Sequence, residues 1–169
     1  VIKLSSRSKG TITHLDLLEG FTDHILSFVK PDVIVGKKIV IDTANGMGGL
    51  IVPSVFKQIP SDIKILYGEL DGSFPNHPAD PLNQDNLKDL IKSVVDSSAD
   101  IGLAFDGDAD RVFLIDETGT PLSGSVTTAI VAKSILDRHS DATIIHNLIC
   151  SQVVAETILA EGGNAVRSR

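Results

Sequence analysis

Three aspartates alternate along one short stretch of the chain. Asp106, Asp108 and Asp110 follow a run of apolar residues, and only glycine and alanine separate them. Three carboxylates held close together repel one another unless a cation neutralises them. The small residues between them let the loop curl until all three carboxylates point inward. Carboxylate oxygens suit Mg²⁺, Mn²⁺ or Ca²⁺ rather than Zn²⁺, so the spacing predicts a divalent-cation site.

Arg111 follows the third aspartate directly. A guanidinium beside a metal ion suits recognition of a phosphate, because its planar donors match phosphate oxygens. A cation and an arginine together supply the positive charge that phosphoryl transfer needs. The loop therefore indicates a site that binds a metal ion and a phosphate.

Two other structures could account for part of this loop sequence. A solvated Asp-Gly turn would explain Asp106 and Gly107, but not the alternation that follows. An EF-hand would match the acidic positions, because Glu117 stands at position 12 counted from Asp106. Its position 6 calls for glycine, however, and holds Arg111, and the flanking residues have strand patterns rather than helical ones. We favour the metal loop.

The elements that must position this loop alternate between strand and helix. Apolar spacing predicts helices through 17–29 (capped by Thr13), 48–58 and 87–95, and strands at 37–41, 63–67, 101–105 and 111–115. Such alternation is typical of an α/β fold. We expect a mixed, mostly parallel sheet flanked by helices on both faces, with 111–115 as the hairpin partner of 101–105.

The pattern restarts after Pro121. Residues 125–136 and 151–161 have helical spacing, while 142–145 and 164–166 have strand patterns. We expect a truncated second α/β domain, with boundaries at 1–118 and 119–169. Because the chain lacks an initiator methionine and ends as a strand begins, we also expect a piece of a longer protein.

Composition narrows the class of protein. The 169 residues carry 22 acidic and 15 basic side chains, a net charge of −7, which weighs against nucleic acid and anionic membranes as partners. The apolar runs are too short to cross a membrane. A single cysteine, Cys150, excludes an internal disulfide framework. These features predict a cytoplasmic globular protein.

Several motifs resemble those of one enzyme family. The segment DGDADR at 106–111 is similar to the metal-binding loop of the α-D-phosphohexomutases. VIDTANG at 40–46 resembles a strand and turn of their second domain, and GTPLSG at 119–124 the start of their third. FPNHPADPL at 74–82 is similar to the FPNHxPDP segment of the phosphomannomutase/phosphoglucomutase branch. The resemblance covers essentially the whole chain, as domain II and the N-terminal part of domain III.

The resemblance implies a four-domain phosphotransferase. Such enzymes interconvert hexose 6-phosphate and hexose 1-phosphate through a phosphoserine and a bisphosphorylated sugar. It implies that Asp106, Asp108 and Asp110 bind Mg²⁺ and that Arg111 contacts the phosphoserine or the transferring phosphate.

The family's serine motif, of the type TASHN, has no counterpart in this chain. Ser5, Ser6 and Ser8 lack the following His-Asn and are interpreted as a solvated linker. We therefore expect this piece to be inactive alone and to work with the parent enzyme's remaining domains on a hexose phosphate. A stand-alone module that binds divalent cations or phosphosugars, or a non-catalytic remnant, is the alternative.

Three further positions carry weaker signals. His77 either contacts the active-site cleft or stabilises its own loop, and we favour the second. Asn45 and Gly46 suit either a phosphate-cradling turn or close packing of helix and strand. Gln152 stands where relatives of this branch often have a basic residue, so no catalytic cation is assigned there.

Overall fold

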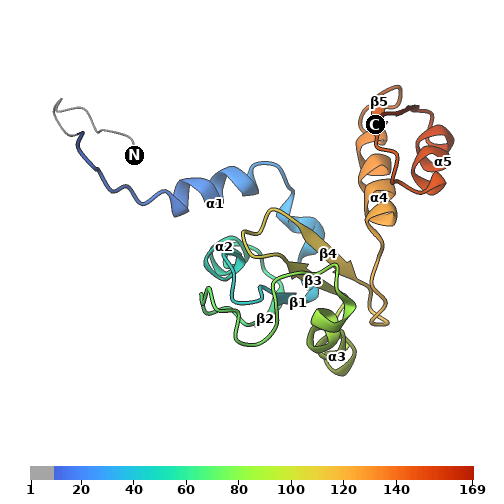
Figure 1. Cartoon of the computed structure of the whole chain (residues 1–169). Coiled ribbons are helices and arrows are strands. Elements are labelled where there is room, and N and C mark those ends of the chain that lie inside the picture. Colours follow the sequence, from blue (N-terminus) through green and yellow to red (C-terminus); the bar gives the residue numbers. More distant parts are fainter. Residues whose placement is uncertain (1–9) are drawn as a thin grey trace, which may run out of the picture.

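The computed structural model describes residues 10–169 (Figure 1), so the linker serines at 5, 6 and 8 lie outside the described residues. The elements in chain order are α1 (Leu18–Leu26), η1 (Pro31–Ile34), β1 (Lys38–Asp42), α2 (Gly48–Phe56), β2 (Asp62–Leu66), η2 (Gln84–Leu87), α3 (Lys88–Ser97), β3 (Ile101–Phe105), β4 (Val112–Ile115), α4 (Gly124–Leu136), β5 (Thr143–His146), α5 (Gln152–Ala160) and β6 (Asn164–Arg167).

A four-stranded sheet with the order β2-β1-β3-β4 carries the aspartate loop. Strand β1 pairs in parallel with β2 and with β3, so that Ile41 lies opposite Ile65 on one side and Leu103 on the other. Strand β4 runs antiparallel to β3. The predicted mixed, mostly parallel sheet with a hairpin partner is confirmed.

Helices pack on both faces of this sheet, as predicted. Helix α3 buries Leu90 and Val94 against Val40, whereas Val52 of α2 packs with Ile39 and Ile41 on the opposite face. Successive residues of β1 point to opposite faces, and the strand is apolar throughout because both faces are covered. The core therefore fixes β1 and β3, the strands that lead into the loops of the site.

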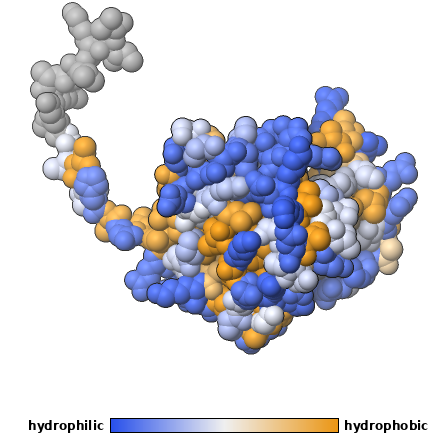
Figure 2. Space-filling view, turned by 90° about the horizontal axis from the view of Figure 1, so that it is seen from below, coloured by the Kyte–Doolittle hydropathy of each residue, from blue (hydrophilic) through white to orange (hydrophobic). Residues whose placement is uncertain are grey.

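Helix α1 spans Leu18–Leu26 and so ends three residues before the predicted 29, and the predicted cap at Thr13 is wrong. Helix α1 begins at Leu18, whose N–H donates to Oδ1 of Asp16 at 3.0 Å. Ile12 and Leu15 are 86% and 77% exposed, so the preceding segment has no apolar surface to pack against. Helices in proteins are stabilised mainly by such packing. In Figure 2, apolar (orange) and hydrophilic (blue) atoms alternate along the segment that adjoins the grey residues.

The second predicted group of elements is present in the expected order. Helices α4 and α5 pack through Leu136, Val154 and Ile158, and β5 pairs in parallel with β6. Ser123 and Ser151 cap the two helices through their hydroxyl oxygens. The boundary between 118 and 119 remains a prediction. Within residues 10–169, each helix is too short or too polar to traverse a bilayer.

Candidate metal centre

The aspartate loop joins β3 to β4 at the carboxyl end of the parallel strands. In open α/β sheets this edge is where ligands bind, because the loops after several strands gather there. The turn after β1 and the long loop after β2 lie beside the aspartate loop: the N–H of Met47 donates to the carbonyl of Gly107 at 2.9 Å, and Phe74 lies against Gly107.

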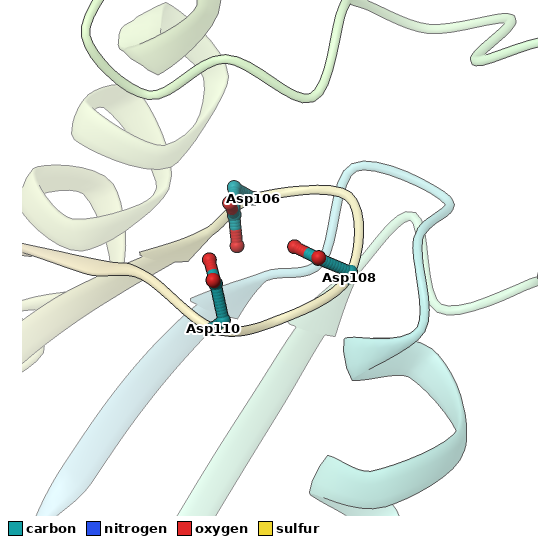
Figure 3. A group of neighbouring side chains, drawn as sticks. All are labelled: Asp106, Asp108 and Asp110. Atoms are coloured by element: carbon teal, nitrogen blue, oxygen red, sulfur yellow. The ribbon is translucent and has the colours of Figure 1, made fainter.

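The loop brings the three predicted carboxylates together. One oxygen from each of Asp106, Asp108 and Asp110 lies within 4.8 Å of the others, and Figure 3 shows the three side chains turned toward a shared space. Asp106 is fully buried, whereas Asp108 and Asp110 are exposed. The spacing suits one hard cation, whose ligand oxygens lie about 2.0–2.6 Å from the ion.

Arg111 holds the buried carboxylate from two sides. Its backbone N–H donates to Oδ1 of Asp106 at 3.1 Å, and its Nε donates to Oδ2 at 2.6 Å. Burial alone would raise the pKa of Asp106, but these hydrogen bonds and the guanidinium charge hold that pKa below its ordinary value. Asp106 is therefore a carboxylate at neutral pH, which is the form that binds a metal ion.

The two exposed aspartates supply the remaining charge. The negative charge of Asp108 raises the pKa of Asp110, and contact with Asp106 adds to the effect. Nε of Arg111 lies 3.5 Å from Oδ1 of Asp110, but more than half of the Arg111 side chain is exposed. The like-charge repulsion expected from the spacing is therefore present, and a bound cation would relieve it.

The backbone of the loop is tightly curled. Asp106 accepts the N–H of Ala109 at its carbonyl, and its own N–H donates to the carbonyl of Arg111. Ala109 has φ +61°, a left-handed conformation that non-glycine residues seldom adopt. Because β3 and β4 flank the loop, the EF-hand alternative is wrong.

The turn after β1 packs tightly against the loop. A Cβ added to Gly46 would lie 2.6 Å from the carbonyl oxygen of Gly107. The N–H groups of Ala44, Asn45, Gly46 and Met47 donate to oxygens of the chain itself. These donors are occupied, so the structure favours close packing over a phosphate-cradling turn at Asn45 and Gly46.

His77 binds a buried residue that sequence reasoning missed. Its Nε2 lies 3.0 Å from Oδ2 of Asp42, and its Nδ1 lies 2.9 Å from the carbonyl oxygen of Pro78. Burial raises the pKa of Asp42, against the lowering effects of the Ala44 N–H and of His77. These contacts support the loop-stabilising interpretation of His77. The available signal for Asp42 was a charged residue closing an apolar strand.

Gln152 is not part of this cluster. It is the first residue of α5 and is exposed. No described hydrogen bond joins it to the aspartate loop.

The sequence comparison decides the family. A family model described as phosphoglucomutase/phosphomannomutase, alpha/beta/alpha domain II, matches residues 19–119, which is more than half of the chain. The chain belongs to the phosphoglucomutase/phosphomannomutase family. The resemblance found in the sequence motifs is thereby confirmed.

Relatives and solved structures agree with this membership of the phosphoglucomutase/phosphomannomutase family. A phosphomannomutase/phosphoglucomutase of Pseudomonas syringae pv. tomato is 35% identical over 94% of the chain, and a phosphomannomutase of Methanocaldococcus jannaschii is 39% identical over 84%. The crystal structure of a phosphoglucomutase/phosphomannomutase family protein from Burkholderia thailandensis superposes with a TM-score of 0.85 and 29% identity, covering 91% of this chain and 33% of that one.

This phosphoglucomutase/phosphomannomutase family member spans about a third of the length of those relatives. The matched region is 34% of the Pseudomonas protein and 32% of the Methanocaldococcus protein. Residues 19–119, which the family model matches, include all four strands of the sheet β2-β1-β3-β4 and the aspartate loop.

Proposed function

We propose that the chain is part of an intramolecular phosphotransferase that interconverts hexose 6-phosphate and hexose 1-phosphate. The observation that carries the proposal is the convergence of Asp106, Asp108 and Asp110 beside Arg111 at the ligand-binding edge of the sheet. The names of the relatives support this reaction, because they are phosphomannomutases and phosphoglucomutases.

In this proposal the three aspartates hold Mg²⁺. Their oxygens are hard ligands, and their spacing fits one small cation with positions left for other oxygens. The bound ion would supply positive charge beside the phosphoryl group. Manganese would occupy the same ligands, which makes it a useful probe.

Arg111 has two roles in the proposal. Within residues 10–169 its side-chain contacts run through Nε, which binds Asp106 and approaches Asp110. The terminal amino groups of its exposed guanidinium are therefore available to a phosphate oxygen. An arginine fixed at Nε presents those donors in one orientation, which suits a phosphate held by the neighbouring cation.

The nucleophile belongs to another part of the proposed parent enzyme. The chain contains no TASHN-type motif, so the phosphoserine would come from the remaining domains. We propose residues 1–118 as domain II and 119–169 as the first part of domain III, acting in the cytoplasm on a hexose phosphate. By itself the 169-residue chain is expected to be inactive.

A domain exchange tests this proposal. Residues 19–119 replace the matching segment of the Pseudomonas syringae relative, and conversion of mannose 1-phosphate to mannose 6-phosphate is measured. The chimera should convert the substrate, the same chimera with Asp108→Asn should not, and the 169-residue chain alone should show no conversion. A folded chimera without activity, or activity unaffected by Asp108→Asn, would contradict the proposal and favour a separate binding module.

A further inference from the structure

His77 and Asp42 form a buried hydrogen bond between distant parts of the chain. Since a carbonyl oxygen only accepts hydrogen bonds, Nδ1 of His77 donates to Pro78. Nε2 of the same ring faces Oδ2 of Asp42 at 3.0 Å. That pair needs one proton between its two atoms, carried either by the imidazolium or by the carboxyl group. The side chains are only 15% and 2% exposed, so water competes little for this bond.

Other side chains hold the histidine ring in place. The ring of Tyr67 meets that of His77 edge to face, with centroids 5.3 Å apart. The Tyr67 hydroxyl donates to Asp89 at 2.6 Å, which anchors the tyrosine to α3. The other oxygen of Asp42 accepts the N–H of Ala44 at 2.9 Å. Asp42, Pro78 and Tyr67 therefore hold the imidazole in one orientation.

The segment that contains His77 also supports the aspartate loop. The position of a Cβ on Gly107 lies 3.5 Å from Cζ of Phe74 and 3.6 Å from Cβ of Ala79. Asn76, between them, donates to the side chain of Asn45 at 2.8 Å. His77 lies in the middle of this segment, and Gly107 lies between two of the three converging aspartates. A displacement of residues 74–79 would thus remove one wall of the loop.

We propose that His77 is a positioning residue for the metal loop, acting by fixing segment 74–79 against Gly107 through its hydrogen bond to Asp42. The inference rests on the proposed metal role of Asp106, Asp108 and Asp110. Residues that orient metal ligands without touching the ion typically change metal affinity about 10- to 100-fold when they are altered.

Mn²⁺ binding to the full 169-residue chain tests the inference. Bound and free Mn²⁺ are measured by electron paramagnetic resonance, and folding by circular dichroism and thermal midpoint. His77→Ala should weaken Mn²⁺ binding by about ten-fold. His77→Gln places an amide donor near the position of Nε2 and should restore affinity to within about two-fold. Asp42→Asn should also keep the Mn²⁺ affinity within about two-fold of wild type, because the asparagine amide can donate a hydrogen bond to Nε2 of a neutral His77 ring.

A core variant separates positioning from stability. Val94→Ala removes buried apolar volume from α3 without touching the histidine contact, so it should lower the thermal midpoint and leave Mn²⁺ affinity unchanged. If His77→Ala does not fold, His77→Phe fills a similar volume without a donor and should show the same loss of affinity.

The outcomes are distinguishable. Unchanged Mn²⁺ affinity in folded His77→Ala or His77→Phe would overturn the positioning role alone, as would an equal loss in Val94→Ala. Wild-type chain that binds no Mn²⁺, or binds it equally well with Asp108→Asn, would overturn the proposed metal site and this inference with it.

Discussion

Arg111 satisfies both oxygens of Asp106 at once, through its backbone N–H at 3.1 Å and its Nε at 2.6 Å. The carboxylate is fully buried, while more than half of the arginine side chain is exposed. One residue thus keeps a buried ligand ionised and also presents a guanidinium at the mouth of the site. The same arginine therefore stabilises the fold of the loop and supplies the cation that the proposed phosphate contact needs.

Removing the arginine side chain should harm the loop before any phosphate is involved. Arg111→Ala leaves Oδ2 of buried Asp106 without its charged partner, and an unpaired buried carboxylate is costly. We expect a lower thermal midpoint and a raised pKa for Asp106. Arg138→Ala, which removes an exposed arginine in the turn after α4 that donates to the carbonyl of Ser134, serves as the control and should change the midpoint little. Equal midpoints for both variants would contradict the structural role of Arg111.

The acid sensitivity of the chain should depend on Asp106. Its pKa lies lower in the folded chain than the value of about 3.9 expected when unfolded. A group with a lowered folded pKa stabilises the fold above the unfolded pKa, and that stability is lost as the pH falls through the folded pKa. Denaturant unfolding of Asp106→Asn should therefore show a flatter pH dependence below about pH 4 than wild type. A pH dependence left unchanged by Asp106→Asn would refute the assignment.

The absorbance of Tyr67 offers a direct test of its hydrogen bond to Asp89, the contact that anchors Tyr67 beside His77. It is the sole tyrosine, and the chain has no tryptophan, so tyrosinate absorbance reports this residue alone. The hydrogen bond to Asp89, followed by burial, raises the pKa of Tyr67 to about 12. Asp89→Asn should bring the midpoint of the absorbance titration back toward about 10. A native midpoint near 10 in wild type would show that the Tyr67–Asp89 contact does not form.

Magnesium should stabilise the chain through the aspartate loop. A ligand that binds only the folded state at 100 times its Kd adds about 2.7 kcal/mol to the free energy of unfolding. Asp108→Asn should abolish that gain. Without Mg²⁺ the same variant should be no less stable than wild type, because the charge of Asp108 repels Asp110. A Mg²⁺-dependent gain that persists in Asp108→Asn would locate the bound ion elsewhere.

Gly49 of α2 lies so close to the backbone of Gly68 that a side chain at this position should destabilise the fold. A Cβ on Gly49 would lie 2.1 Å from the carbonyl oxygen of Gly68, so Gly49→Ala should destabilise the chain by about 1–3 kcal/mol despite the better helix propensity of alanine. Gly20 in α1 has open space around it, and Gly20→Ala should stabilise by up to about 1 kcal/mol. Chemical denaturation measures both, and equal effects would contradict the packing of α2 on the loop after β2.

The local parts of the site were predictable from sequence. The alternation of Asp106, Asp108 and Asp110 after an apolar strand is contained within five residues, and loop closure over such a distance needs no information from elsewhere. The strands were also predictable from local sequence, because a run such as 101–105 is apolar throughout and bounded by polar residues.

The contacts between distant segments were not predictable. Asp42 and His77 are 35 residues apart in sequence, and a histidine in a polar loop shows no periodicity that would indicate its partner. The predicted cap at Thr13 was wrong for a related reason. The apolar spacing of α1 is helical from Leu17 onward, but Ile12 and Leu15 are exposed, so no packing stabilises another turn within residues 10–17.

The most direct test of the central claim is X-ray diffraction from crystals of the 169-residue chain grown with Mn²⁺. The account predicts one anomalous scattering peak between the carboxylates of Asp106, Asp108 and Asp110, at about 2.0–2.6 Å from an oxygen of each. The same peak should be lost in Asp108→Asn. An ion bound elsewhere, or an aspartate loop without a peak at saturating Mn²⁺, would contradict the claim that this loop is the metal site.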